Sequence, residues 1–293
     1  MTMLVLGGSG QLALALSAAA EAAGIDCARL GRPEFDFDRP ETVAALDSVP
    51  ARLIVNAAAY TAVDAAEGDA AAAERANAAG PALLAAHCVR RGIPLVHIST
   101  DYVFDGSKGA PYIETDPTAP LGVYGATKLA GERAAMAAWP RTVILRTAWV
   151  YSATGRNFAR TMLGAARKTD TLRVVADQRG CPTTAADLAA AIVAIAPRLS
   201  DGWEDGLAGI YHAAGGGETT WHGLAVALFE EAARHGLKMP TVTPIATSDW
   251  PTPVRRPADS RLDCGKLARV FGVALPHWRD SVAPVVDAWY AAA

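Results

Sequence analysis

Cysteine is scarce in this sequence, and no residue pattern typical of a metal site occurs. The four cysteines, Cys27, Cys88, Cys181 and Cys264, are far apart and form no CxxC pair. This spacing argues against a disulfide framework and fits a reducing compartment. The six histidines show neither HxH nor HExxH spacing, so each is expected to be a core or surface residue rather than a ligand. We therefore assign no metal site from the sequence.

A basic excess and long apolar runs are also missing. The formal net charge is −3 and no run of lysine and arginine occurs, so nucleic acid is not an expected partner. No apolar stretch reaches the roughly 18 residues of a membrane-spanning helix. The apolar start Met1–Leu6 has no basic flank and breaks into glycines too early for a signal peptide. We expect a cytoplasmic protein that binds a small molecule and contacts no membrane.

The chain does have a large apolar fraction, arranged in an alternating order of elements. Of its 293 residues, 51% are hydrophobic and 19% charged, so a substantial core can form. Over the first 150 residues, short β-rich runs alternate with longer alanine-rich segments, which predicts a parallel sheet covered by helices on both faces. We expect strands at 3–6, 26–30, 53–56, 95–99 and 143–147. The clearest helices are expected at 11–23, 70–91 (bent near Pro81) and 124–138.

The alternation is looser after Thr147. It continues with a helix at 157–167, a strand at 172–175, a helix at 185–196 and a strand at 209–212. Beyond Gly215, helices are separated by the proline-rich stretch Pro240–Pro257. The predicted fold class is α/β, a Rossmann-like doubly wound parallel sheet at 1–152 that binds NAD(P). A smaller, mostly helical substrate-binding region is predicted at 153–293, with parts of 170–214 returning to the sheet.

A glycine-rich turn follows the first predicted strand. Gly7-Gly8-Ser9-Gly10-Gln11-Leu12-Ala13 stands between an apolar strand and a helix. Gly7 permits the tight turn, Gly10 lets the backbone approach a pyrophosphate, and the amides at Gln11 and Leu12 can donate to it. In this context the turn predicts a dinucleotide site, with a plain strand–helix turn as the alternative. The third small position is Ala13 rather than glycine.

The end of the second strand bears on which dinucleotide binds. Leu30-Gly31-Arg32-Pro33 offers an arginine to a 2′-phosphate instead of a carboxylate to ribose hydroxyls. This favours NADPH, with NADH possible because Glu34 is near. A solvated surface charge is the alternative for Arg32. We assign Asp36 and Phe37, in the following loop, to the adenine end, where the carboxylate either accepts from the adenine amino group or caps a helix.

Tyr124 and Lys128 stand four residues apart in a predicted helix and therefore share one helix face. An ammonium beside a phenol favours the phenolate and lowers a pKa that is normally about 10. Such a tyrosine can protonate a carbonyl oxygen as hydride arrives at the carbon. The fourth predicted strand ends in Ser99-Thr100-Asp101, which places the Thr100 hydroxyl at the carboxyl edge of the sheet. A packed tyrosine with a solvated lysine, and a strand-terminating turn at Thr100, are the alternatives.

Together these motifs resemble the extended short-chain dehydrogenase/reductases, and longer stretches resemble the dTDP-4-dehydrorhamnose reductase family. The stretches are Asn56–Glu67, Ser99–Gly106, Arg146–Tyr151, Asp177–Thr183, and Arg255-Arg256-Pro257 with Ser260 and Leu262. The resemblance therefore spans nearly the whole chain. It implies reduction of the C4 ketone of dTDP-6-deoxy-L-lyxo-4-hexulose (dTDP-4-dehydro-L-rhamnose) with NADPH or NADH. The product would be dTDP-L-rhamnose, a precursor of cell-wall and surface polysaccharides.

The resemblance also implies roles for individual residues. Tyr124 is the acid, Lys128 its electrostatic partner and the anchor of the nicotinamide ribose, and Thr100 the hydrogen-bonding helper. The further cofactor-binding residues after the third strand are Ala57, Ala58, Ala59 and Tyr60. The further substrate-binding residues are Thr61, Val63, Asp101, Trp149, Asn157 and Arg256. Trp149 packs on the sugar or alternatively in the core, and Arg256, or else Arg255, pairs with the two phosphates.

One departure from the family concerns a metal. Some members dimerise around a magnesium ion held by glutamates, one of them just after the glycine turn, where this chain has Leu14-Ala15-Leu16. We do not carry over this site, and the sequence leaves the oligomeric state open. Two other functions compete with the reductase: a noncatalytic dinucleotide-binding regulatory subunit, and a reductase of another nucleotide-linked 4-ketosugar. The intact set of Tyr124, Lys128 and Thr100 favours an enzyme.

Overall fold

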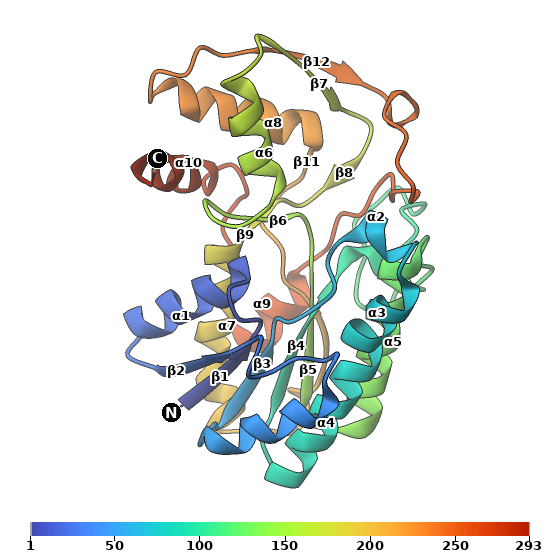
Figure 1. Ribbon diagram of the computed structural model, residues 1–293, viewed down its shortest axis with the longest axis vertical. Coiled ribbons are helices and arrows are strands. Elements are labelled where there is room, and N and C mark those ends of the chain that lie inside the picture. Colours follow the sequence, from blue (N-terminus) through green and yellow to red (C-terminus); the bar gives the residue numbers. More distant parts are fainter. Residues whose placement is uncertain (1, 293) are drawn as a thin grey trace.

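A six-stranded parallel sheet forms one half of the molecule, in a computed structural model that describes residues 2–292 (Figure 1). Its strands are β1 (Thr2–Leu6), β2 (Asp26–Leu30), β3 (Leu53–Asn56), β4 (Leu95–Thr100), β5 (Thr142–Thr147) and β10 (Gly209–His212). Their order is β10-β5-β4-β3-β1-β2. The chain winds outward from β1 in both directions, so the topological switch point lies between β1 and β3. In such sheets ligands bind at the carboxyl ends of the strands beside this point.

Helices cover both faces of the sheet, as predicted. The helices α1 (Gln11–Ala22) and α7 (Ala185–Ser200) pack on one face, and α4 (Gly80–Arg91) and α5 (Val123–Ala138) on the other. Strand β1 contributes side chains to the hydrophobic core on each face of the sheet. Met3 and Val5 pack in the core under α1 and α7, and Leu4 and Leu6 pack in the core under α4. This alternation follows from the two-residue period of a strand. Consecutive apolar residues therefore mark a strand that is buried on both faces.

The helix predicted over 70–91 is irregular in the middle. It consists of α3 (Ala70–Glu74), a π-helical turn η2 (Arg75–Ala79) and α4. The widened turn ends two residues before Pro81, whose nitrogen cannot donate to a regular helical hydrogen bond. Gly131 of α5 allows this turn to approach closely, because a Cβ there would lie 2.0 Å from the Asn77 carbonyl oxygen.

The other half of the molecule lies over the carboxyl ends of the strands (Figure 1). It contains α6 (Phe158–Ala166), α8 (Trp221–Ala233) and α10 (Val282–Ala291). The strand expected at 172–175 is present as β7 (Thr171–Val175), but it does not continue the central sheet. It pairs in parallel with β12 (Thr241–Ile245), a strand within the proline-rich stretch that we had not predicted. Pro244 is tolerated there because the sheet has only two strands, both of them edges.

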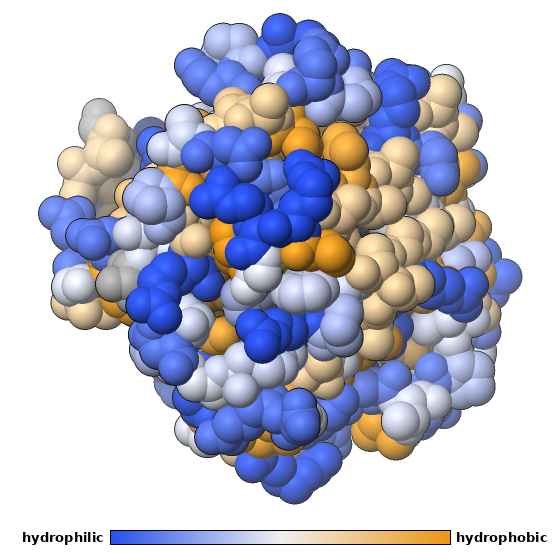
Figure 2. Space-filling view, turned by 90° about the horizontal axis from the view of Figure 1, so that it is seen from below, coloured by the Kyte–Doolittle hydropathy of each residue, from blue (hydrophilic) through white to orange (hydrophobic). Residues whose placement is uncertain are grey.

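Several later segments return to the central sheet. Helix α7 packs on α1, strand β10 pairs with β5, and α9 (Gly265–Phe271) contacts β10. The remaining short elements are η1 (Pro40–Ser48), α2 (Val63–Ala66), η3 (Asp101–Val103), β6 (Val150–Tyr151), β8 (Arg179–Gly180), β9 (Thr183–Thr184), β11 (Thr219–Thr220) and η4 (Thr247–Asp249). Polar and apolar residues intermix on the face seen from below (Figure 2). Within residues 2–292, no helix has the length and apolarity to cross a membrane.

Candidate active site

The glycine-rich turn after β1 forms a tight backbone crossing. Gly7 (φ 141°) and Gly8 (φ 54°) adopt conformations that favour glycine, and both amides donate to the Leu30 carbonyl oxygen at 3.1 Å. A Cβ on Gly31 would lie 2.4 Å from the Gly8 Cα, so the end of β2 also requires glycine. Gly10 caps α1 and has no side chain to occupy the first amides of the helix. The turn therefore fits a pyrophosphate, with amide donors at a helix start.

The loop after β2 contains a group of exposed charges. The Arg32 side chain is 71% exposed, and it pairs through Nε with Asp36 and through Nη2 with Asp38, both at 3.1 Å. The residue that caps η1 is Arg39, so Asp36 is not its helix cap. Phe37 is buried and packs edge-to-face against Phe35, with ring centroids 4.9 Å apart. Arg32 is thus accessible to an anion, whereas Phe37 lies mainly in the core.

Two buried asparagines fix the loop Ala57–Tyr60 after β3. Asn56 accepts from the Ala58 amide at 3.1 Å and contacts His97 Nδ1 at 3.0 Å. Asn77, in the π-helical turn, accepts from the Tyr60 amide at 2.8 Å and donates to the Tyr60 carbonyl at 3.1 Å. The half-buried loop is therefore held from both sides at the switch point of the sheet. Sequence reasoning did not single out Asn77, since its partners are distant in the chain.

Tyr124 lies in the first turn of α5, and its side chain lies beside that of Thr100 at the end of β4. Burial raises the pKa of Tyr124 above its usual value, while the Thr100 hydrogen bond opposes this change. The ring packs edge-to-face against Tyr102, with centroids 5.6 Å apart. Glu67 accepts from the Val123 amide at 2.7 Å and so caps the start of α5. Tyr124 and Thr100 thus come together as predicted, on a helix end that the sequence did not show to be capped.

Lys128 lies one helical turn further along α5 and is almost completely buried. Its ammonium donates to the Ile98 carbonyl at 2.6 Å and lies 3.3 Å from His97 Nε2. Burial lowers the pKa of Lys128 to about 8, although the charge of Glu132 opposes this shift. The prediction that Lys128 lowers the pKa of Tyr124 is wrong for this structure. The ammonium is held by β4, and loss of solvent dominates at the phenol.

Asp101 follows Thr100 and is buried beneath it rather than exposed on a pocket wall. The Thr100 hydroxyl donates to Asp101 Oδ1 at 3.1 Å, whereas Asp101 Oδ2 is buried without a hydrogen-bond partner. Burial raises the pKa of Asp101 to about 6, against the opposing effect of its polar neighbours Ser260 and Thr100. Asp101 therefore supports the orientation of Thr100 and links β4 to the C-terminal motif.

Arg256 reaches across to α2 from the segment after β12. Its Nη2 pairs with Asp64 Oδ2 at 2.7 Å, and its Nη1 donates to the Tyr102 hydroxyl at 3.4 Å. The side chain is 17% exposed, whereas Arg255 is exposed to solvent. Val63 lies next to Asp64, and Thr61 is exposed two residues before it. Arg256 thus contacts α2, which begins at Val63, and has a carboxylate partner that the sequence did not reveal.

Trp149 and Asn157 follow β5. Thr147 of β5 pairs in register with Thr100 of β4. Trp149 therefore stands two residues beyond the residue that lies next to Thr100. Trp149 stacks on Trp221, which sequence reasoning treated only as part of the C-terminal helices. Asn157 Nδ2 donates to Gln11 Oε1 at 3.2 Å, and Gln11 Nε2 donates to the Val150 carbonyl at 3.2 Å. Gln11 therefore connects the glycine turn to the substrate side.

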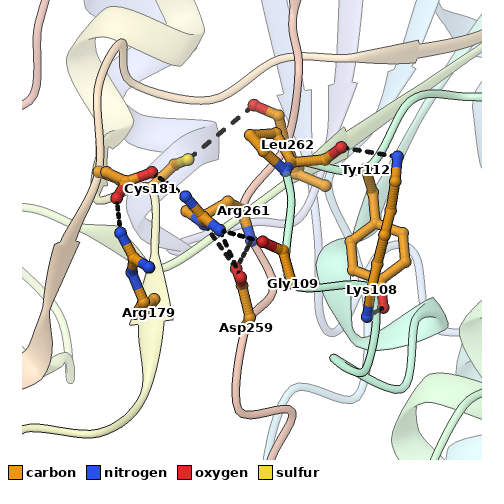
Figure 3. Close-up of polar contacts among 10 residues, drawn as sticks. Lys108, Gly109, Tyr112, Arg179, Cys181, Asp259, Arg261 and Leu262 are labelled. Carbon is orange, nitrogen blue, oxygen red and sulfur yellow. Dashed lines mark hydrogen bonds and ion pairs between the residues drawn. The ribbon is translucent and has the colours of Figure 1, made fainter.

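An arginine that the sequence analysis did not select holds the segment 259–262 of the C-terminal motif in place (Figure 3). Arg261 pairs with Asp259 at 2.6 Å and donates to the Gly109 carbonyl at 3.2 Å. Its own carbonyl accepts from the Tyr112 amide at 2.7 Å. Cys181 lies beside the same segment, with its Sγ 4.0 Å from the Leu262 carbonyl. These contacts fix the 259–262 segment, including Ser260, which reaches Asp101.

The described part of the chain, 2–292, contains no group of three or more histidine, cysteine or acidic side chains placed to hold a metal ion. All four cysteines are free thiols. The polar chemistry at the carboxyl edge of the sheet therefore consists of a phenol, a hydroxyl and an ammonium. Together with a phosphate cradle at the switch point of a doubly wound sheet, this set defines a dinucleotide-dependent short-chain dehydrogenase/reductase of the extended type.

Comparison with known proteins narrows the class to one family. The family model described as RmlD substrate binding domain matches residues 1–291. A dTDP-4-dehydrorhamnose reductase of Sinorhizobium fredii is 45% identical over 291 residues, which cover 98% of this chain and 97% of the relative. The enzyme of that name from Mycobacterium tuberculosis is 40% identical over 294 residues, with 98% and 92% covered. The chain belongs to the dTDP-4-dehydrorhamnose reductase family.

Solved structures show the same relationship. A dTDP-4-dehydrorhamnose reductase from Clostridium acetobutylicum superposes with a TM-score of 0.90 at 33% identity, covering 98% of this chain and 99% of that one. The Bacillus anthracis enzyme, in complex with NADP, has a TM-score of 0.88 at 30% identity, with 97% and 98% covered. The fold and the family that the sequence motifs indicated are confirmed.

Proposed function

We propose that this protein reduces the C4 ketone of dTDP-4-dehydro-L-rhamnose to give dTDP-L-rhamnose, with NADPH as the reductant. The observation that carries the proposal is the position of Tyr124 beside Thr100 at the carboxyl edge of the sheet, with the Lys128 ammonium one helical turn away. Membership of the same family as the dTDP-4-dehydrorhamnose reductases of Sinorhizobium fredii and Mycobacterium tuberculosis supports the choice of substrate.

The cofactor-binding part, which we propose to span residues 1–152, offers a partner to each section of NADPH. The turn at Gly7 and Gly10, with the amides of Gln11 and Leu12, suits the pyrophosphate. The exposed Arg32 suits the 2′-phosphate, and it makes NADPH the preferred cofactor over NADH. The other proposed contacts are Asp36 and Phe37 for the adenine end, Ala57, Ala58, Ala59 and Tyr60 along the loop after β3, and Lys128 for the nicotinamide ribose. When bound, NADPH supplies the hydride.

Tyr124 is proposed to supply the proton. Its raised pKa keeps the phenol protonated at neutral pH, which is the form that reduction of a ketone requires. As negative charge develops on the sugar O4, the phenol donates its proton to that oxygen. Thr100 lies beside the phenol and is proposed to help orient the ketone oxygen, while its own position is fixed by its hydrogen bond to Asp101. The mechanism therefore needs a protonated tyrosine rather than a stabilised phenolate.

The substrate-binding part is proposed to span residues 153–293, with parts of 170–214 in the sheet, and to use side chains from both halves of the chain. We assign to the dTDP-sugar the residues Thr61, Val63, Thr100, Trp149, Asn157 and Arg256, with Asp101 acting through Thr100. A partly exposed indole suits the C–H side of a deoxysugar. Arg256 is proposed to face the diphosphate with the donors that its ion pair with Asp64 leaves unused.

The experiment offers the purified protein dTDP-4-dehydro-L-rhamnose and NADPH and follows cofactor oxidation. We expect one NADPH to be oxidised for each dTDP-L-rhamnose formed. Binding of NADPH without turnover would instead support a noncatalytic regulatory subunit. Faster turnover of a different nucleotide-linked 4-ketosugar, offered in parallel, would reassign the substrate.

A further inference from the structure

Two tryptophans from distant segments stack face to face beside the proposed sugar site. Trp149 lies just after β5, and Trp221 is the first residue of α8. Their ring centroids are 3.5 Å apart and their planes differ by 6°. Isolated aromatic pairs prefer offset or edge-to-face packing. A close parallel pair of this kind is therefore held by the residues around it.

The backbone of Trp149 is held in an unfavourable conformation. Its φ of 48° is the only left-handed value of a non-glycine residue within 2–292. Bulky side chains rarely adopt this region, and they do so where surrounding contacts over-determine it. One such contact is Gly180, where a Cβ would lie 2.4 Å from Trp149 Cε2. Only a glycine lets this segment approach the indole so closely.

Trp221 is itself fixed on several sides. Its Nε1 donates to Gln178 Oε1 at 3.1 Å, and Gln178 Nε2 donates to Thr247 Oγ1 at 3.0 Å. Phe158 of α6 packs against the same indole, with centroids 4.7 Å apart. Trp221 is thus tied to α6, to the turn before β8 and to η4. Its indole cannot rotate without breaking these contacts, so it provides a rigid partner for Trp149.

We propose that Trp221 is a positioning residue for the sugar subsite. By covering one face of the Trp149 indole, it holds Trp149 in the left-handed conformation and leaves the part of the indole that neither Trp221 nor Gly180 covers for the apolar side of the 6-deoxyhexose. The inference deepens the proposed function and rests on it. The strand register places Trp149 near Thr100, because Thr147 of β5 pairs with Thr100 of β4 and Trp149 follows Thr147 by two residues.

The kinetic test uses substitutions at Trp221 and Gln178. We expect Trp221→Ala to raise the KM for the dTDP-sugar roughly tenfold, the size of effect that loss of an aromatic contact produces. The Kd for NADPH should change by less than about twofold, since the cofactor side is untouched. Trp221→Phe and Gln178→Leu should raise the KM less, because each keeps part of the arrangement. Trp203→Phe, at the amino edge of the sheet, is the matched control and should change neither constant.

A spectroscopic test reports on the stack without any turnover. Because Trp149 and Trp221 contact each other, the losses of stability in Trp149→Leu and Trp221→Leu should not add in the double variant, and near-ultraviolet circular dichroism followed during a urea titration measures them. The losses in Trp221→Leu and Trp203→Leu should add, since these two residues pack in different hydrophobic clusters. Additive losses for Trp149 and Trp221 would contradict the stacked arrangement.

The outcomes separate the two proposals. A wild-type protein that does not turn over the dTDP-sugar removes the proposed function and the inference with it. A wild-type protein that turns over while Trp221→Ala keeps the wild-type KM overturns the inference alone. If Trp221→Ala does not fold, Trp221→Phe and Gln178→Leu decide. An unchanged KM in both of these would overturn the positioning role.

Discussion

The cofactor side and the substrate side of this site are built in different ways. On the cofactor side, the amide donors come from neighbours in sequence, in the turn from Gly7 to Gln11. On the substrate side, the contacts join distant segments, as in the stack of Trp149 on Trp221 and the ion pair of Arg256 with Asp64, 192 residues apart. Strand–turn–helix units make a cofactor site from local sequence, whereas the substrate pocket requires the complete fold.

The two sides also differ in how their charges are buried. Glu132 and Arg146, behind the cofactor side, have side chains that are 1% and 2% exposed, while Arg32 at its rim is 71% exposed. A buried charge needs its partner for the protein to stay folded, and an exposed charge contributes mainly to recognition. Replacing a buried charge should therefore change stability, whereas replacing an exposed charge should change ligand binding.

Removing Glu132 should reduce stability the most. Arg146 donates to its carboxylate from Nε and Nη2, at 2.9 and 2.7 Å, and Ser99 donates to it as well. Glu132→Ala leaves a buried guanidinium without a partner, so the free energy of unfolding should fall by about 3–5 kcal/mol. Denaturant titration measures this change. The control Glu204→Ala, which breaks the exposed pair with Arg198, should cost less than about 1 kcal/mol. Similar losses in both variants would contradict the distinction between buried and exposed pairs.

Replacing the proposed acid should reduce turnover without affecting cofactor binding. Tyr124→Phe keeps the ring and its packing against Tyr102 but removes the proton, so kcat should fall by at least about a hundredfold. Stopped-flow kinetics with NADPH and the dTDP-sugar measures kcat, and fluorescence titration measures the NADPH Kd, which should stay unchanged. Unaltered turnover would exclude Tyr124 as the proton donor.

Lys128 should control the alkaline limb of the pH profile. Its pKa is lowered to about 8 by burial, so the ammonium dominates below that pH and the neutral amine above it. Because the ammonium is the form proposed to act, kcat/KM should fall roughly tenfold per pH unit above this pKa and stay level just below it. The profile of Lys128→Met should lack this limb and be low throughout. A limb of the same shape in Lys128→Met would assign it to another group.

Replacing Arg32 should change the preference between NADPH and NADH, and this is the smallest of the four expected effects. Arg32→Ala should weaken NADPH binding by roughly threefold to tenfold, because the contact to a 2′-phosphate is exposed to solvent. NADH binding should hardly change, since it has no 2′-phosphate. The control Arg52→Ala removes a similarly exposed arginine that pairs with Asp201, away from this rim. Equal effects on the two cofactors would show that Arg32 does not recognise the phosphate.

Sequence patterns were sufficient for the sheet and its glycine turn. Each expected strand of the central sheet lies within a residue of the observed one, because a strand buried on both faces needs a continuous apolar run. Strand β12 was missed, since its two-stranded sheet tolerates the prolines that normally exclude a strand. The pKa of Tyr124 was predicted in the wrong direction. Helical spacing places Lys128 on the right face but does not reveal that β4 binds its ammonium.

Sequence reasoning could not find the residues that act through tertiary contacts. Asn77, Glu67 and Trp221 each touch segments far from themselves in the chain, and none stands in a spacing that signals its contact. Arg256 was selected only through a family resemblance, and its partner Asp64 only became visible in the fold. Periodicity and turn chemistry describe local geometry, so the complementary half of a long-range pair stays hidden until the chain is folded.

The most direct measurement of the central claim is the fate of a labelled hydride. The protein is mixed with dTDP-4-dehydro-L-rhamnose and NADPH that carries deuterium in place of both hydrogens at the nicotinamide C4, and the product is analysed by nuclear magnetic resonance. The account predicts dTDP-L-rhamnose with deuterium bound to the sugar C4. Deuterium at any other position, or no deuterated sugar while NADPH binds, would contradict it.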